Sequence, residues 1–282
     1  MQFVSLQQAI QTYITDGMTV ALEGFTHLIP FAAGHEIIRQ GKKDLTLIRM
    51  TPDLIYDQMI GMGCAKKLVF SWGGNPGVGS LHRLRDAVEK HWPYQLELDE
   101  RSHAAMAAAW QAGAARLPMG LLKGYTGTDL LHANAAAAKT VICPFSSAEL
   151  VAVPALNPDV TVIHAQAADR QGNILIEGII GPVREAAMAA TTLIVTVEAL
   201  VERHEKTMNA IILPHWMVDA VVQVQGGAYP SYVQGWYQRD NKFYQQWDDI
   251  SRERETFLSW MQQFVLNTEN HQQFLRLVEA GR

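Results

Sequence analysis

A glycine-rich segment at residues 73–80, Gly-Gly-Asn-Pro-Gly-Val-Gly-Ser, is the strongest local signal for chemistry in this sequence. It follows an apolar run that predicts a strand at 67–72. Glycines let backbone N–H groups converge on an anion or a carbonyl oxygen, and the N-terminus of a following helix adds positive potential. The segment has neither the Gly-Lys-Ser/Thr ending of a P-loop nor the glycine spacing of a dinucleotide-binding fingerprint. A binding turn of another kind and a structural turn are both open interpretations.

The segment 20–30, Val-Ala-Leu-Glu-Gly-Phe-Thr-His-Leu-Ile-Pro, is a second candidate. It predicts a buried strand that stops at Gly24 and enters a polar turn. Because open α/β sheets bind ligands at the carboxyl ends of their strands, this turn is a predicted ligand site. Glu23 is either a catalytic acid or a hydrogen-bonding anchor for the turn, and we favour the anchor.

Other charged side chains near strand ends have less specific patterns. His27 in the turn and Arg49 at the end of the neighbouring strand can each pair with a substrate carboxylate, or lie on the surface. Glu97, Asp99 and Glu100 form an acidic cluster suited to a paired-carboxylate hydrolase. A solvated junction between strand and helix is the simpler interpretation of that cluster.

A nucleophile and a metal site are both missing from the sequence patterns. No Gly-x-Ser-x-Gly elbow occurs, and His35-Glu36 lacks the second histidine of a zinc-protease motif. Cys64 and Cys143 match no zinc spacing and predict buried thiols in a reducing compartment. The sequence therefore predicts an anion-binding scaffold with neither a metal nor a convincing nucleophile.

Apolar segments of two periodicities alternate along the chain. Strands are expected at 19–24, 45–50, 67–72, 95–98, 141–143, 160–165, 173–177, 193–198 and 218–224, and helices at 5–15, 31–40, 52–63, 81–90, 103–115 and 183–190. Ser80 is expected to cap the N-terminus of the helix at 81–90, and Gly41 is expected to end the helix at 31–40. Residues 117–140 are expected to be rich in loops. This alternation predicts an α/β fold with a parallel sheet covered on both faces. We assign residues 1–245 to this domain and 246–282 to a helical extension packed on it and broken near Asn267.

Composition narrows the classes of partner. The chain has 282 residues, 48% of them hydrophobic, and a net charge of -5, which argues against nucleic acid or an anionic membrane as the main partner. A charged fraction of 18% and seven tryptophans favour a subunit interface. The sequence shows no secretion signal and no apolar run long enough to span a membrane, so a cytoplasmic location is expected.

Nine segments, spread in order over nearly the whole chain, carry a family resemblance. They are residues 21–26, 38–45, 75–79, 152–154, 159–166, 194–198, 218–222, 227–231 and 235–241. In these segments the chain resembles the alpha (A-type) subunit of family I coenzyme A-transferases. The branch is the one that contains glutaconate and 3-oxoadipate CoA-transferases, and the likeness is greatest to the 3-oxoadipate enzymes of aromatic degradation.

The resemblance implies a three-layer α/β/α fold and a heteromer of alpha and beta subunits, a heterodimer or heterotetramer, with the active site between them. In this family a glutamate of the beta subunit attacks the acyl-CoA, forming an acyl anhydride and then an enzyme–CoA thioester. No catalytic nucleophile is therefore expected in this chain. The implied reaction moves CoA from succinyl-CoA to a 3-oxo acid such as 3-oxoadipate, with the CoA thioester as substrate and no tightly bound cofactor.

The residues expected to bind the acid or its anhydride lie at or after strand ends: Gly24, Phe25, Thr26, Ser71, Asn75, Gly77 and Ser80. Arg49 or His27 is expected to neutralise the distal carboxylate of a dicarboxylic acid, and Glu23 and Glu100 are the weaker acid candidates. Two alternatives stay open. One is a subunit of a CoA-thioester hydrolase of the same superfamily, with Glu100 as the acid to examine, and the other is a non-catalytic ligand-binding chain.

Overall fold

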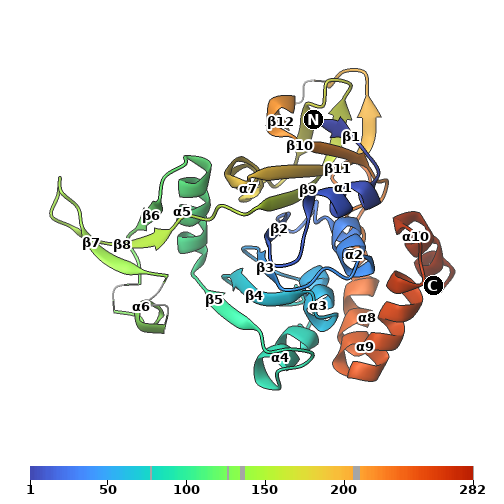
Figure 1. The fold of residues 1–282 in the computed structure, drawn as a ribbon, viewed down its shortest axis with the longest axis horizontal. Coiled ribbons are helices and arrows are strands. Elements are labelled where there is room, and N and C mark those ends of the chain that lie inside the picture. The colour runs from blue at the N-terminus through green and yellow to red at the C-terminus, as the bar shows by residue number, and fades with distance from the viewer. Residues whose placement is uncertain (77, 126, 134–136, 206–209, 282) are drawn as a thin grey trace.

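A mostly parallel sheet forms the centre of the molecule. The computed structural model describes residues 1–281 except 77, 126, 134–136 and 206–209. In this part of the chain eight strands follow one another in the sheet, and each neighbouring pair is parallel. Their order is β1 (Gln2–Phe3), β13 (Ala220–Gln223), β11 (Thr192–Val201), β9 (Val160–Asp169), β2 (Thr19–Glu23), β3 (Leu45–Ile48), β4 (Ala65–Phe70) and β5 (Glu97–Glu100). The predicted parallel sheet is confirmed (Figure 1).

An antiparallel extension continues one end of this sheet. β10 (Ile174–Glu177) pairs with the end of β9 and with β12 (Ala210–Leu213), and the short helix η1 (His215–Met217) follows β12. The sequence pattern does not predict β12. Its Ala-Ile-Ile-Leu sequence is apolar but only four residues long, and pairing with β10 gives it its strand geometry.

Helices cover both faces of the sheet, which confirms the three layers. Side chains alternate along β2, so Val20 and Leu22 lie in one core and Ala21 lies in the core on the opposite face. The first face carries α1 (Leu6–Tyr13), α2 (Phe31–Arg39), α3 (Leu54–Gly61) and α4 (His82–Glu89). The second carries α5 (His103–Ala114) and α7 (Val183–Ala189). No helix in the described ranges is both long and apolar enough to cross a membrane.

Two predicted helix ends have different outcomes. Gly41 follows α2 with φ 62, a left-handed conformation that glycine adopts easily, as predicted. Ser80 does not cap α4, which begins at His82 after Leu81. Instead, Oδ1 of Asp57 in α3 accepts hydrogen bonds from the N–H groups of Arg83 and Leu84, both at 2.9 Å. The cap comes from another helix, so the local sequence does not reveal it.

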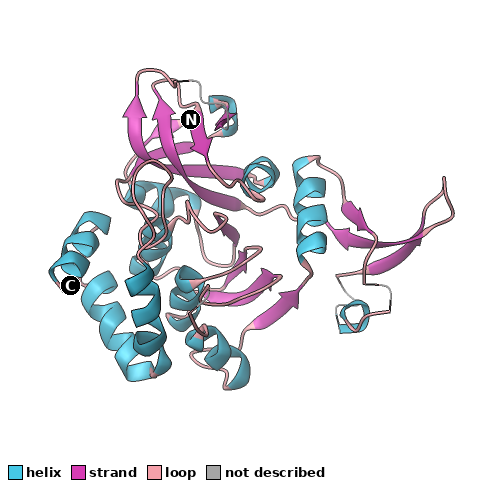
Figure 2. Cartoon of the chain, turned by 180° about the vertical axis from the view of Figure 1, so that it is seen from behind, coloured by secondary structure: helices cyan, strands magenta, loops and turns pink. Residues whose placement is uncertain are grey.

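A three-stranded antiparallel arm stands off from the body. It contains β6 (Met119–Leu122), β8 (Glu149–Pro154) and β7 (Lys139–Ile142), and α6 (Leu130–Ala133) lies beside it (Figures 1 and 2). β6 lies within residues expected to be loop, and β8 is a strand that the sequence pattern does not predict. Gly120 explains the first difference, because a Cβ there would lie 2.3 Å from the Ala108 carbonyl oxygen. The glycine that weakens the strand pattern is what lets β6 pack on α5.

The C-terminal residues form α8 (Asn241–Arg252), α9 (Arg254–Met261), the π-helix η2 (Gln262–Leu266) and α10 (His271–Ala280), with the predicted break at Asn267. They pack on α2, where Arg39 Nε donates to the Val265 carbonyl oxygen at 3.0 Å and the rings of His35 and Phe274 lie 4.6 Å apart. The boundary proposed at 245/246 lies inside α8. The division into a domain and an extension stays a prediction.

Candidate active site

The turn at residues 24–28 follows β2 at the carboxyl edge of the parallel sheet. A Cβ on Gly24 would lie 2.6 Å from the Leu28 carbonyl oxygen, so the turn closes on a residue without a side chain. Thr26 and Leu28 have φ values of 63 and 54, which are uncommon for non-glycine residues and especially for a β-branched one. Such conformations persist only where the surrounding structure imposes them, and they gather at ligand sites.

A distant segment holds this turn in place. The Leu28 N–H donates to the Tyr232 carbonyl oxygen at 3.0 Å, and the Ser231 hydroxyl donates to the Thr26 carbonyl oxygen at 3.2 Å. The ring of His27 stacks on that of Tyr232, with centroids 4.9 Å apart. The family segment 227–231 indicates the importance of this region, but nothing in its sequence indicates contact with the turn.

The segment 226–237, which contains Ser231 and Tyr232, is itself anchored by a buried polar cluster. The Glu198 carboxylate accepts hydrogen bonds from the Gly226 N–H and the Tyr237 hydroxyl, both at 2.7 Å. It also lies 2.7 Å from His164 Nε2 in the neighbouring strand. These hydrogen bonds hold the pKa of Glu198 below its usual value against the effect of burial. Glu198 thus links β9 and β11 to the segment that supports the site.

His27 is fully buried, and its Nε2 donates to the Ile179 carbonyl oxygen at 2.8 Å. Burial lowers the pKa of its ring, which favours the neutral form. A neutral ring with one nitrogen already bonded to the backbone is poorly suited to neutralise a substrate carboxylate.

Arg49 has protein partners for both terminal nitrogens. Its Nη1 donates to Asp53 Oδ1 and its Nη2 to the Gly24 carbonyl oxygen, each at 2.9 Å, and the side chain is buried. In this arrangement the guanidinium binds the turn from behind. A substrate carboxylate would have to displace one of these contacts.

Glu23 lies in the same buried cluster. Its Oε1 accepts a hydrogen bond from the Met50 N–H at 3.3 Å, and burial raises its pKa to about 7 although Arg49 opposes the shift. One arginine faces two carboxylates, Glu23 and Asp53, so a proton on one of them balances the charge near neutral pH. This geometry is consistent with the anchoring role favoured for Glu23.

Ser71, directly after β4, and His103 lie close together at the same edge of the sheet. The Ser71 hydroxyl donates to the Met50 carbonyl oxygen at 2.6 Å and lies 3.1 Å from Nδ1 of His103, the first residue of α5. Hydrogen bonds therefore run from Glu23 through the backbone of Met50 to Ser71 and His103. The sequence does not identify His103 as a site residue, since an isolated histidine before an alanine-rich helix has no motif.

A cavity of about 320 Å³ opens beside the turn, between α5 and the start of α7. Its lining residues come from the two strand ends and these helices: Phe25, Met50, Ala107, Trp110, Gln111, Gly181, Pro182 and Glu185. The Trp110 indole N–H is buried and has no acceptor among the described residues. The cavity is lined mainly by apolar groups next to a strained turn, as in small-molecule sites.

The glycine-rich turn lies against the C-terminal helices. Asn75 Nδ2 donates to the Tyr244 carbonyl oxygen at 2.7 Å, and Arg239 Nη2 donates to the Pro76 carbonyl oxygen at 3.1 Å. A Cβ on Gly79 would lie 2.3 Å from Asp248 Oδ1. Gly77 lies outside the described residues, and Ser80 is half-buried before α4. Asn75 and Ser80 therefore do not line the cavity beside Phe25.

The acidic residues around β5 do not act as one cluster, because Asp99 and Glu97 have separate partners. Asp99 forms a two-bond ion pair with Arg101, at 2.8 and 3.0 Å, and Glu97 pairs with Lys67. Glu100 ends β5 and is exposed. Three or more side chains of the metal-binding types do not gather anywhere in the part of the chain that is described.

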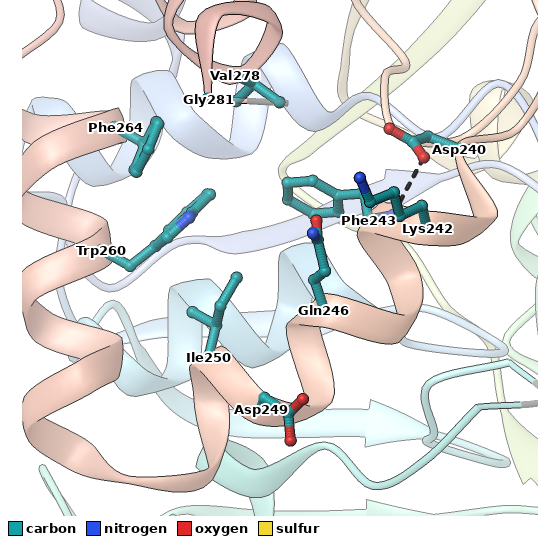
Figure 3. A pocket seen from close by; sticks show the side chains of 10 residues that line it. All are labelled: Asp240, Lys242, Phe243, Gln246, Asp249, Ile250, Trp260, Phe264, Val278 and Gly281. Carbon is teal, nitrogen blue, oxygen red and sulfur yellow. Dashed lines mark hydrogen bonds between the residues drawn. The ribbon is translucent and has the colours of Figure 1, made fainter.

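A second hollow, of about 310 Å³, lies between the C-terminal helices (Figure 3). The rings of Phe243, Trp260 and Phe264 face it, and Lys242 and Gln246 lie on its rim. None of the predicted site residues lines it, so we place the candidate site at the sheet edge.

This chain is similar over its full length to known proteins. The A-type subunit of 3-oxoadipate CoA-transferase from Pseudomonas knackmussii is 56% identical over 281 residues, covering 100% of this chain and 99% of the relative. A crystal structure of glutaconate coenzyme A-transferase from Acidaminococcus fermentans matches with a TM-score of 0.91 at 30% identity, covering 100% of this chain and 94% of that one. The cholesterol ring-cleaving hydrolase IpdA subunit of Rhodococcus jostii is 26% identical, covering 96% of this chain and 94% of the relative.

The family model for coenzyme A transferase matches residues 3–224, which include β2, the turn after it and the cavity. The match and the full-length relative agree with the resemblance found in the sequence. The chain belongs to the coenzyme A transferase family.

Proposed function

We propose that this chain is the alpha subunit of a heteromeric CoA-transferase that moves CoA from succinyl-CoA to 3-oxoadipate. The observation that carries the proposal is the 56% identity, over the whole chain, to a relative named as the A-type subunit of 3-oxoadipate CoA-transferase. Acyl-CoA and a dicarboxylic acid are then the small-molecule partners. The reaction takes place in the cytoplasm and needs no tightly bound cofactor.

The nucleophile is a glutamate of the partner, the beta subunit. Its carboxylate attacks the thioester carbonyl of succinyl-CoA, and CoA leaves as the thiolate while an acyl anhydride forms. The thiolate then attacks the anhydride at the glutamate carbonyl, giving an enzyme–CoA thioester and releasing succinate. Attack by 3-oxoadipate and a second exchange of the same kind complete the transfer. Covalent catalysis of this kind divides one difficult exchange into easier steps.

This chain contributes donors for the oxyanions of those steps. The N–H groups of Phe25 and Thr26 have no acceptor within the described chain, and the strained turn fixes their direction. Removing one donor from a preformed oxyanion site typically costs about 2.7–4 kcal/mol of transition-state stabilisation. Gly24 contributes the close approach of the backbone, and Arg49 holds its carbonyl group away from the substrate.

The beta subunit covers the carboxyl edge of the sheet. Three large apolar side chains near the site are exposed in the isolated chain: Trp72 next to Ser71, Ile179, whose carbonyl oxygen binds His27, and Trp236 in the segment after Tyr232. Apolar surface of this kind is typical of subunit interfaces. The predicted surface for the partner is thus continuous with the predicted site.

The hydrolase alternative has weaker support. The IpdA relative is 26% identical, against 56% for the transferase relative over a similar length of chain. Hydrolysis would require a water-activating acid at the site, and Glu100 at the end of β5 is not among the residues that line the cavity.

Co-expression with the beta subunit tests the proposal. We expect the heteromer to transfer CoA from succinyl-CoA to 3-oxoadipate, and each of the two subunits to be inactive without the other. Mass spectrometry after addition of succinyl-CoA should find a CoA adduct only on the beta subunit. Thioester loss without an acceptor acid would identify a hydrolase, and no reaction in the assembled heteromer would support a ligand-binding chain.

A further inference from the structure

A dicarboxylic acid brings a second negative charge into the site, and neither residue expected to receive it is available. Both terminal nitrogens of Arg49 bind protein oxygens, and the side chain is 1% exposed. His27 is 0% exposed and uses Nε2 for a backbone carbonyl. Arg49 Nε and His27 Nδ1 have no hydrogen-bond partner among the described residues, but both atoms are buried, so a carboxylate reaches neither of them unless the turn moves. The distal carboxylate therefore requires an exposed donor at the same edge of the sheet.

The hydrogen bonds of Ser71 show which ring nitrogen of His103 donates to it. A carbonyl oxygen can only accept, so the single hydroxyl proton of Ser71 goes to the Met50 carbonyl oxygen at 2.6 Å. The 3.1 Å contact must then be a donation from His103 Nδ1–H to Ser71 Oγ. The proton on Nδ1 is fixed by this contact, and Nε2 is left for an external partner.

The position of His103 fits a substrate at the cavity. His103, Ala107 and Gln111 are spaced four residues apart on α5, so they share one face of the helix. Ala107 and Gln111 line the cavity together with Met50, the residue whose carbonyl group binds Ser71. His103 is exposed and stands one helical turn before Ala107, at the end of α5 nearest Ser71.

The charges around the cavity favour one orientation of the acid. Glu185 lines the cavity from α7 and is paired with Arg184, Nη2 to Oε1 at 2.6 Å, so the arginine at that end already binds a carboxylate. Most of the other lining groups are apolar, which suits the methylene chain of the acid. A dicarboxylic acid bound with its carbon chain along α5 would place its distal carboxylate beside the histidine.

We propose that His103 binds the distal carboxylate of the acid substrate through Nε2–H, as an imidazolium whose Nδ1–H is held by Ser71. This inference rests on the proposed function and names the residue that selects dicarboxylic over monocarboxylic acids. Ser71 acts as a positioning residue, because its own proton is directed to the Met50 carbonyl oxygen.

Two substitutions of His103 distinguish the roles of its two ring nitrogens. His103→Asn keeps an amide N–H near the position of Nδ1, so the Ser71 contact can persist while the distal donor is lost. His103→Gln extends an amide towards the position of Nε2. His91→Asn is the matched control, since His91 is exposed after α4 and has φ 55, a conformation that asparagine tolerates.

The readout is the ratio of kcat/KM for 3-oxoadipate to kcat/KM for 3-oxohexanoate, which differs from it by lacking the distal carboxylate. The heteromer with His103→Asn should lose about tenfold or more of this ratio, as expected for a hydrogen bond to a charged group. His103→Gln should lose less, and His91→Asn should leave the ratio unchanged. An unchanged ratio in His103→Asn, or an equal fall for both acids, would overturn the inference.

Binding of the two acids, measured by calorimetry on the same heteromers, gives a readout that needs no turnover. The unsubstituted heteromer should bind 3-oxoadipate more tightly than 3-oxohexanoate, and His103→Asn should abolish the difference. A heteromer that shows this pattern without transferring CoA would contradict the proposed function but not the role of His103. Equal binding of the two acids by the unsubstituted heteromer would contradict the role of His103.

Discussion

The turns after β2 and β4 show how different two glycine-containing loops at one sheet edge can be. The turn at 24–28 has a single glycine, two non-glycine residues with positive φ, and a cavity beside it. The turn at 73–80 has four glycines, and its Asn75, Pro76 and Gly79 contact the C-terminal helices and the segment before them.

Glycine content by itself does not identify a binding turn. Glycine permits close packing, and the packed group can be a ligand or another part of the chain. At Gly79 the close group is the Asp248 carboxylate, whereas at Gly24 it is the backbone of the same turn. The strained turn next to a cavity is therefore the better candidate, although it has the weaker sequence signal.

Arg49→Ala should break the turn at 24–28 most severely. It removes the hydrogen bond to the Gly24 carbonyl oxygen and leaves two buried carboxylates, Glu23 and Asp53, without their cation. Loss of one partner of a buried ion pair typically costs about 3–5 kcal/mol. Urea unfolding of the heteromer measures this, and Arg49→Met combined with Asp53→Leu should recover part of the loss. A stable Arg49→Ala variant with a raised KM for 3-oxoadipate would instead make Arg49 a substrate ligand.

Gly24→Ala should have the next largest effect on the turn. The new Cβ would approach the carbonyl oxygens of Leu28 and His27 to 2.6 and 2.8 Å, so the backbone of the turn must shift. Displacement of catalytic donors by about 1 Å can lower turnover about 100-fold. Steady-state kinetics of the heteromer measures the effect. Gly41→Ala is the control, since no heavy atom lies within 4 Å of its Cβ position, and it should reduce stability without altering kcat.

Asn75→Ala should affect the second turn in the opposite way. The Tyr244 carbonyl oxygen loses its donor, so the free energy of unfolding should fall by about 1–3 kcal/mol while KM and kcat stay within about twofold. Ser80→Ala, at a half-buried residue that does not cap α4, should change stability by no more than about 0.5 kcal/mol. If Asn75→Ala abolished turnover in a heteromer of unchanged stability, the ranking of the two turns would have to be reversed.

Glu23→Gln should have a modest effect and sharpens the role of the buried acid. The folded-state pKa of about 7 is above the ordinary value of 4.5, so the native state binds more protons and stability falls as pH rises through this window. The contribution of Glu23 to the free energy of unfolding should decrease by about 1 kcal/mol between pH 6 and pH 8. Glutamine keeps the oxygen that binds the Met50 N–H and should remove this dependence while turnover persists. Complete loss of turnover in an assembled heteromer would make Glu23 catalytic.

Much of the fold follows from patterns within single segments. The strands β2, β3 and β4 are short apolar runs between helices, and this alternation predicts a parallel sheet with two covered faces. The arm is less accessible to prediction, because Gly120 and Pro154 weaken the strand pattern of β6 and β8. The α4 cap on Asp57 depends on the packing of two helices, which no local signal reports.

The sequence points to the position of the candidate site but not to its contacts. The end of β2 is identified from its glycine and its place after a buried strand, and the structure has the strained turn there. Whether Arg49 faces a substrate or the protein depends on Asp53 and the Gly24 carbonyl group, and this is decided by tertiary packing. His103 lies next to Ser71 although 32 residues separate them, so only the assembled sheet edge brings them together.

Hydrogen exchange of the assembled heteromer, with and without succinyl-CoA, tests most directly whether the turn after β2 is the binding turn. We expect slower amide exchange at residues 24–28 when the thioester is present, because the N–H groups of Phe25 and Thr26 then have acceptors. Exchange at residues 73–80 should stay the same. Slower exchange at 73–80 with no change at 24–28 would contradict the account and return the site to the glycine-rich turn.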